Sequence, residues 1–275
     1  MAVITISHQM GAGGPEIGMK LGQKLGYRYV DQELVLDVAR RYGVAEDKLS
    51  HLDESKPTLF ERFDTETRYY ITILQTSLLD FAEMDNHVLM GRGGQWLLRG
   101  IPHVLRLRVI APFELRVKRW IRRTADMTGE TPTQRAAADF VRRDDTEKSG
   151  RMKYLYEVDL ADPMLYDMTV STERLSYDAA VEMISSAINR PEMATSDAAR
   201  RTVASRALAS RVQVALAINA ETRRYRISVE ADDGVVTLEG TGALERAVEV
   251  ARDVPGVRVV TTRQLEVPPI PPFVA

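Results

Sequence analysis

The sequence predicts an α/β protein in which a parallel sheet has helices on both faces and a smaller α+β unit follows it. Three observations lead to this prediction. Short β-branched runs alternate with amphipathic helical patterns from residue 1 to about residue 190. A polar stretch of small residues, interrupted by Pro191, then breaks this alternation at 189–201. The patterns after the break are too short to continue the first sheet, so they indicate a second fold unit.

The first unit is predicted to alternate between strands and helices. The strands are expected at residues 3–7, 87–90, 104–110 and 168–171. The helices are expected at about 15–26, 32–42, 59–84, 112–123, 133–150 and 176–189. This order is typical of parallel strands whose connecting helices cover the two faces of the sheet.

The second unit is predicted to be a small α-β-β-α-β module. Its helices are expected at about 200–219 and 242–252, and its strands at 225–230, 235–239 and 257–267. An Asp-Asp-Gly turn joins the first two strands. The chain then ends in a proline-rich segment that we expect to be extended.

These patterns give the expected domain organisation. It consists of a first domain at 1–190, a linker at 191–201, a second domain at 202–267 and a tail at 268–275. Because each domain brings its own strands and helices, we expect the fragment 1–190 to be soluble and to keep its ligand binding.

The composition excludes several kinds of chemistry. The chain has no cysteine, which excludes disulfides and thiolate sites, and its four histidines are scattered without the spacing of a zinc site. A net charge of −2 gives no reason to expect a nucleic-acid partner. Neither a signal-peptide pattern nor an apolar run of about 18 residues is visible, so we expect a cytoplasmic protein. Homo-oligomer formation stays open.

A glycine-rich loop follows the first predicted strand. Gly11, Gly13 and Gly14 permit the unusual dihedrals with which backbone N–H groups surround a phosphate at a helix N-terminus. Pro15 suits the first helical position, which needs no N–H. A phosphate-binding loop of the common type would have lysine at position 15 and a hydroxyl at position 16, whereas this chain has Pro15 and Glu16. The alternative is a glycine turn that binds nothing.

Further along the chain, charged residues stand where they could close such a site. Five cations lie within residues 142–153, which we interpret as a lid that neutralises a phosphoryl group; a solvated helix face is the alternative. Asp31 either binds a ligand or caps the helix predicted after it. Arg92 lies between glycines, in neither a strand nor a stable helix, which favours a functional role.

Taken in order, segments of the first domain resemble the cytidylate kinase-like family of P-loop nucleoside monophosphate kinases. The resemblance covers residues 1 to about 190 and runs through "ITISHQMGAGGPEIG", "LGYRYVDQEL", "VLMGRGGQWLL", "VIAPFELRVKR", "RRDDTEKSGRMKY" and "LYDMTVSTERLSYDAAVEMI". It implies a P-loop kinase-like fold, ATP and Mg²⁺ as cofactors, and a nucleotide as substrate.

The resemblance also implies roles for individual residues. The ATP-binding group is Gly11, Ala12, Gly13, Gly14, Pro15, Glu16 and Arg142. The catalytic lid cations are Arg143, Lys148 and Arg151, and the substrate-binding residues are Asp31 and Arg92. Glu16 would act through a bound Mg²⁺.

Two positions depart from the family pattern. Pro15 replaces the lysine of cytidylate kinases and also the arginine of the family's G-S-G-G-R-E branch. Lys148 stands where the lid usually has the arginine of D-x-x-R, so a point charge replaces a bidentate group. The loss of a loop cation bears directly on the rate of phosphoryl transfer.

The second domain resembles a BON domain. The features that carry this resemblance are a strand, an acidic-Gly turn, a strand ending in L-x-G, a helix and a final strand after P-G-V. This resemblance implies contact with a small ligand or a membrane surface. The function expected for the whole chain is ATP-dependent phosphoryl transfer to a CMP-like nucleoside monophosphate or related small acceptor, regulated by the BON domain. The alternative is a catalytically impaired nucleotide sensor coupled to that domain.

Overall fold

The computed structural model of the chain describes residues 2–31, 65–240 and 242–264. The helix predicted at 32–42, the beginning of the helix predicted at 59–84 and the proline-rich tail lie outside the described residues.

The first domain is built on a five-stranded parallel sheet, in the order β2-β3-β1-β4-β5. Its strands are β1 (Val3–His8), β2 (Arg28–Val30), β3 (His87–Met90), β4 (Val104–Ile110) and β5 (Met168–Ser171). The α/β prediction is confirmed. Strand β2 was not predicted from the pattern, because its three residues, only one of them buried, form no apolar run.

Parallel pairing brings the carboxyl ends of the strands to one edge of the sheet. The register sets Val3 of β1 opposite His87 of β3 and Val104 of β4. The glycine loop after β1, Asp31 after β2 and the Gly-Arg-Gly segment after β3 therefore meet at this edge, where ligands bind in open α/β sheets.

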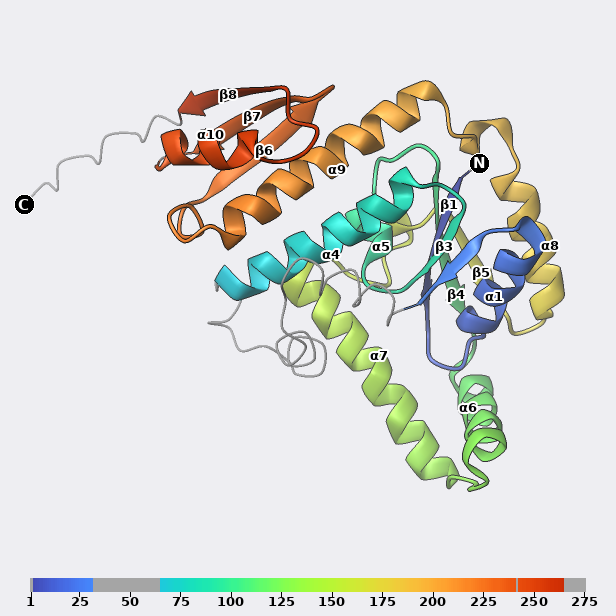
Figure 1. Cartoon of the computed structure of the whole chain (residues 1–275). Helices are drawn as coiled ribbons and strands as arrows, with labels where there is room; N and C mark the ends of the chain where they lie inside the picture. Colours follow the sequence, from blue (N-terminus) through green and yellow to red (C-terminus); the bar gives the residue numbers. More distant parts are fainter. Residues whose placement is uncertain (1, 32–64, 241, 265–275) are drawn as a thin grey trace, which may run out of the picture.

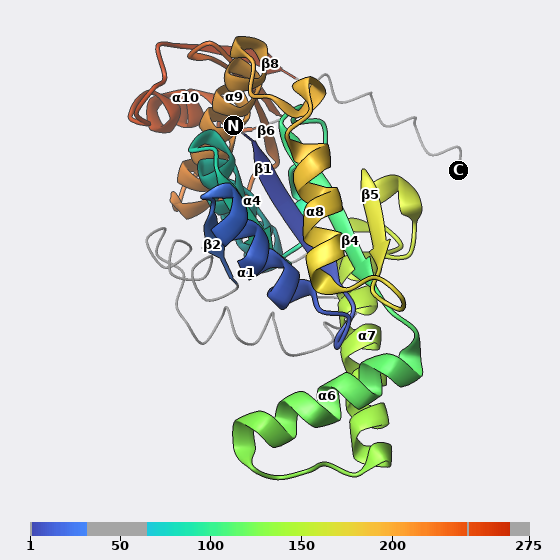
Figure 2. The same ribbon diagram turned by 90° about the vertical axis from the view of Figure 1, so that its right-hand side faces the viewer.

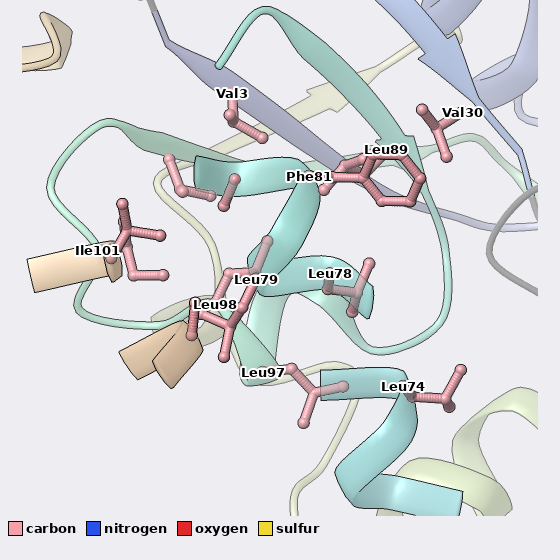
Figure 3. Close-up of a cluster of buried hydrophobic side chains, with 14 of the residues drawn as sticks. Val3, Val30, Leu74, Leu78, Leu79, Phe81, Leu89, Leu97, Leu98 and Ile101 are labelled. Carbon is pink, nitrogen blue, oxygen red and sulfur yellow. The ribbon is translucent and has the colours of Figure 1, made fainter. Parts of the chain in front are cut away.

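Helices cover both faces of this sheet (Figure 2). On one face, α1 (Gly14–Leu25) and α8 (Tyr177–Ile188) pack on alternate strand residues such as Ile4 and Ile6. On the other face, α4 (Thr65–Glu83) and α5 (Gly94–Leu97) share a core with Val3. Figure 3 shows Leu78, Leu79 and Leu98 within this second core.

Two long helices, α6 (Phe113–Thr128) and α7 (Gln134–Tyr156), extend beyond the sheet edge (Figures 1 and 2). We refer to this pair as the lid helices; residues 142–153, to which the sequence analysis gave the lid role, lie on α7. Both helices run past their predicted ends. A small core around Val117 and Val141 holds them together, and the rings of Trp120 and Phe140 stack with centroids 4.6 Å apart. The side chain of Thr133 caps α7 by accepting a hydrogen bond from the N–H of Ala136.

The second unit consists of α9 (Asp197–Ile218), β6 (Ile227–Asp232), β7 (Val235–Gly240), α10 (Leu244–Arg252) and β8 (Val259–Gln264). Strand β7 pairs antiparallel with β6 and parallel with β8. The turn between β6 and β7 has positive φ at Asp233 (42°) and Gly234 (78°), as a two-residue hairpin requires. The unit is thus a small α+β module, as predicted.

Helix α9 belongs to both cores. Figure 1 shows it running beside α4 on one side and the three-stranded sheet on the other. Three of its side chains join the core of the first domain: Val203, Ala207 and Val214. Three others join the core of the second unit: Leu208, Val212 and Leu216. The guanidinium of Arg211 adds ion pairs to Asp80 (2.7 Å) and Glu83 (2.5 Å) of α4. This packing changes what we expect of the fragment 1–190.

Candidate active site

The loop after β1 needs glycine for conformational and steric reasons. Gly11 and Gly13 have φ of 77° and 91°, which a β-branched residue resists. A Cβ at Gly11 would lie 2.5 Å from the carbonyl oxygen of Arg116, and one at Gly13 would overlap the ring of Tyr177. Pro15 lies in the first turn of α1, as the sequence predicted. The loop therefore closes tightly around the N-terminus of α1.

A cavity of about 940 Å³, which we call the loop cavity, opens between this loop, α6 and the start of α8. Its charged lining comes mainly from Arg119, Arg122, Arg123 and Glu16, and its larger apolar side chains are Trp120, Met127, Leu175 and Tyr177. The sequence analysis did not assign the three arginines to a site.

Arg119 is held in place by hydrogen bonds. Its guanidinium donates to the hydroxyl (2.8 Å) and the carbonyl oxygen (2.7 Å) of Thr172, and lies 5.4 Å from the ring centroid of Tyr177. The Thr172 hydroxyl in turn donates to the carbonyl oxygen of Ala12 at 2.8 Å. Thr172 thus ties the α6 arginine to the glycine loop.

A second cavity, of about 340 Å³, lies on the other side of the loop; we call it the Arg92 cavity. It brings together four charged residues to which the sequence analysis gave site roles, namely Asp31, Arg92, Lys148 and Arg151, and it is also lined by Pro15. Consecutive positive φ values at Gly91 (70°), Arg92 (57°) and Gly93 (72°) position the arginine. A left-handed conformation is unfavourable for a residue with a Cβ, and such strain is typical of functional sites.

The two cavities adjoin. His8, Met10 and Pro15 line both of them. Burial, with the positive charges of Lys148, Arg108 and Arg123 in that order, lowers the pKa of His8 to about 3. The imidazole is therefore neutral at physiological pH. Lys148 lines the Arg92 cavity and Arg123 lines the loop cavity, so cations lie on both sides of the boundary, where Pro15 itself supplies none.

Arg116 connects the lid to the loop. It is only 4% exposed, and its guanidinium donates to both carboxylate oxygens of Asp145 on α7, at 3.1 and 2.8 Å. It also donates to the carbonyl oxygens of Met10 (3.2 Å) and Ala111 (3.1 Å). The aspartate of the lid's Asp-x-x-Lys sequence therefore binds an arginine of α6.

Other predicted residues lie elsewhere. Arg142 pairs with Asp139 at 3.2 Å and lies 4.8 Å from the ring centroid of Phe113. Arg143 is exposed, and neither arginine lines the loop cavity or the Arg92 cavity. A role for them in binding ATP or in catalysis stays a prediction that requires the lid to move.

Glu16 lines the loop cavity, and its carboxylate accepts a hydrogen bond from Arg123 at 3.4 Å. Gly14 packs beside the His8 ring, which a Cβ would overlap. In the part of the chain that the structure describes, no group of three or more metal-ligating side chains occurs.

The residues that the sequence analysis missed follow a helical spacing. Arg116, Arg119 and Arg123 are three and four residues apart and so share one side of α6. This spacing was visible in "RVKRWIRR", but nothing local shows that this side of the helix meets the glycine loop.

The neutral state of His8 predicts a pH dependence of stability. Its folded pKa lies below the ordinary value of 6.5, so its contribution is present above pH 6.5 and is lost as the pH falls toward 3. As the pH falls from 6.5 to 5, the unfolding free energy of the wild type should decrease by about 2 kcal/mol more than that of His8→Asn, whose side chain does not titrate. Urea unfolding of both proteins across this range is the measurement. Parallel curves would show that the His8 pKa is not lowered.

The order of the parallel sheet, the helices on both its faces and the glycine loop after β1 define a P-loop kinase-like nucleotide-binding fold. The chain belongs to the cytidylate kinase-like family, whose family model matches residues 3–174. A BON domain model matches residues 205–269. Both resemblances seen in the sequence are confirmed.

Individual proteins agree with this assignment. The chain is 26% identical over 191 residues to the cytidylate kinase of Desulfurococcus amylolyticus, covering 69% of this chain and 94% of that protein. It is 28% identical over 180 residues to the cytidylate kinase of Aeropyrum pernix, covering 65% and 94% of the two chains.

A crystal structure of an uncharacterized protein from Eubacterium ventriosum shares the fold. Its TM-score is 0.51 and its sequence identity is 18%, over 68% of this chain and 98% of the other.

Among the described residues, no helix combines the length and apolarity needed to cross a membrane.

Proposed function

We propose that this chain transfers a phosphoryl group from ATP to a nucleoside monophosphate of the CMP type. The observation that carries the proposal is the pair of adjoining cavities, which meet at His8, Met10 and Pro15. A donor in one cavity and an acceptor in the other would place their reacting groups at this boundary, and phosphoryl transfer depends mainly on such positioning. The relatives named cytidylate kinase support the choice of acceptor.

The residues of the loop cavity fit ATP. The first N–H groups of α1 have no partner within the helix and, with the glycine loop, suit phosphate oxygens. Arg119 and Arg123 supply positive charge on the opposite wall, while Leu175 and Tyr177 supply apolar surface for a base. The volume of about 940 Å³ lies in the range of small-molecule sites.

Glu16 is the carboxylate that would hold Mg²⁺ beside the ATP phosphates. Magnesium is commonly held by one or two carboxylates together with substrate phosphates and water, so a dedicated protein cluster is not required. The ion would neutralise phosphate charge. The Glu16 carboxylate lines the loop cavity and accepts a 3.4 Å hydrogen bond from Arg123, which lines the same cavity.

The Arg92 cavity suits the acceptor. Arg92 would bind the monophosphate, Asp31 would accept hydrogen bonds from the nucleoside, and Arg151 would stabilise the transferring phosphoryl group. Lys148, which acts on His8 at the boundary, would stabilise the charge of the transferring group. We infer that Lys148 and Arg123 together supply the positive charge that a loop lysine provides in other P-loop kinases.

Pro15 favours a second candidate function, that of a nucleotide sensor without turnover. A lysine in the loop would lie directly beside the bound phosphates. Lys148 and Arg123 instead lie on α7 and α6, where they pair with the carboxylates of Asp144 (2.9 Å) and Glu16 (3.4 Å). A chain that binds ATP and a monophosphate without catalysing phosphoryl transfer between them would act as a sensor, with the BON domain as the part that responds to the bound nucleotides.

A coupled ADP-release assay with ATP and Mg²⁺ separates the two functions. CMP, dCMP, UMP and AMP are offered as acceptors, and ATP binding is measured in parallel by calorimetry. Turnover that is fastest with CMP or dCMP supports the kinase. ATP binding without turnover on any acceptor supports the sensor, and failure to bind ATP contradicts both.

Replacing Arg151 by Ala should lower kcat/KM for the monophosphate roughly 10²- to 10³-fold, because a well-placed cation stabilises the transferring phosphoryl group. The matched control is Arg135→Ala, which removes an exposed arginine of the same helix that lines neither cavity. Arg135→Ala should stay within about twofold of wild type, as expected of a surface substitution. Equal losses in both variants would indicate a general effect of lid charge and would contradict the assignment of Arg151.

A further inference from the structure

A third cavity, of about 340 Å³, lies where the two units meet, between α4, α9 and the end of α5. We call it the seam cavity. It shares no lining residue with the loop cavity or the Arg92 cavity. Its described lining is mostly polar, with Arg99 and Arg206 as its charged side chains and the amides of Gln75 and Gln213 beside them. No carboxylate occurs among these described lining residues.

The two arginines are held close together despite their like charge. The Arg206 guanidinium donates a 2.5 Å hydrogen bond to the carbonyl oxygen of Arg99, and the Arg99 guanidinium lies 3.8 Å from the centroid of Trp96. A Cβ at Gly100 would lie 3.2 Å from the Arg206 guanidinium, so glycine allows this close approach. Both arginines are exposed, and partial burial of Arg99, followed by the charge of Arg206, lowers the pKa of Arg99.

We propose that the seam cavity binds a phosphate monoester of about nucleotide size. Two guanidinium groups offer two positive charges and several N–H donors, which match a phosphate monoester dianion in charge and geometry. A single carboxylate would neutralise only one of them. The Gln75 and Gln213 amides can both donate and accept hydrogen bonds, so they suit the polar groups of the rest of such a ligand.

The position of the cavity gives such a ligand a route to the active site. Leu97, the last residue of α5, lines the seam cavity, and α5 begins at Gly94, directly after the segment that positions Arg92. Arg206 belongs to α9, the helix shared by both cores. A ligand that bridges Arg99 and Arg206 would therefore fix the position of α5 relative to α9. Through α5 it would act on Arg92 in the acceptor site. Such coupling between two separate binding sites is what defines an effector.

Trp96 provides a local probe for this site. The chain has two tryptophans, so Trp120→Phe leaves Trp96 as the single one. In this background, titration with CMP, AMP and inorganic phosphate is followed by Trp96 fluorescence. We expect a saturable change with at least one of the two nucleotides. Adding Arg206→Ala should weaken its half-saturation at least 10-fold.

Two further variants separate the seam from the acceptor site. Arg201→Ala removes an exposed arginine of α9 that does not line the seam, and it should leave the titration unchanged. Arg92→Ala should weaken acceptor binding and leave the Arg206-dependent change in place, so a failure of the proposed kinase function does not remove this readout. If none of the three compounds gives a change that depends on Arg206, the proposal is overturned. If inorganic phosphate binds as tightly as both nucleotides, the seam binds a bare anion and the nucleotide-sized ligand is wrong.

Discussion

Replacing Gly13 by Val should abolish ATP binding. Gly13 caps α1 with φ of 91°, and a Cβ there would overlap the ring of Tyr177, which lines the loop cavity. Tyr177 could move aside, but valine would still resist the left-handed dihedral, so the loop would leave the conformation that directs its N–H groups at phosphate. We expect calorimetry to show at least a 100-fold weaker ATP affinity, or no measurable binding.

The control for this variant is Gly26→Val. Gly26 ends the same helix with φ of 68°, and a Cβ there would have no neighbour within 4 Å. It therefore carries a similar dihedral strain, on the order of 1–2 kcal/mol, away from the loop cavity. Gly26→Val should lose stability and keep ATP affinity. If Gly13→Val binds ATP as wild type does, the glycine loop is not the phosphate site.

Removing the second unit should make the first domain unstable and poorly soluble. The sequence analysis predicted a soluble fragment 1–190, but the structure places three buried side chains of α9 in the core that contains α4. Burying a side chain such as valine contributes roughly 1.5–3 kcal/mol, and a domain is stable by only about 5–15 kcal/mol. Without α9, the apolar side of α4 would face water, which favours aggregation.

The measurement compares the fragment 1–190 with the full chain by thermal unfolding, light scattering and ATP affinity. Two point variants of the full chain test the same contact without truncation. Val214→Ala should lower the unfolding free energy by about 2 kcal/mol, because Val214 is buried against the first core. Ile218→Ala, on the same helix but 53% exposed, should change it by less than about 0.5 kcal/mol. A monomeric, ATP-binding fragment would restore the prediction of independent units.

The two arginine-rich helices show why part of the site could be predicted and part could not. The cations of α7 were recognised because a cluster of like charges stands out in a linear sequence. Of these, Lys148 and Arg151 line the Arg92 cavity, while Arg142 and Arg143 do not. The direction in which each points depends on how α7 packs against α6, through residues such as Val117 and Val141.

The sequence by itself determined the features that depend on residues close to one another along the chain. Alternating β-branched and amphipathic patterns predicted the α/β sheet, because the period of burial differs between strand and helix. Glycines at positions 11 and 13 predicted the loop, because their backbone conformation is local. The absence of a loop cation was equally visible in Pro15.

Only the tertiary structure decided which distant side chains meet. It brought Arg119 and Arg123 to the loop cavity, joined Arg116 to Asp145 across the lid, and placed α9 in two cores at once. The spacing of apolar residues along a helix shows which of its faces is buried. It does not show which element covers that face, because any apolar surface of suitable shape would satisfy the same pattern. For this reason the sequence indicated a kinase-like site and a second module, whereas the shared helix and the seam between them emerged from packing.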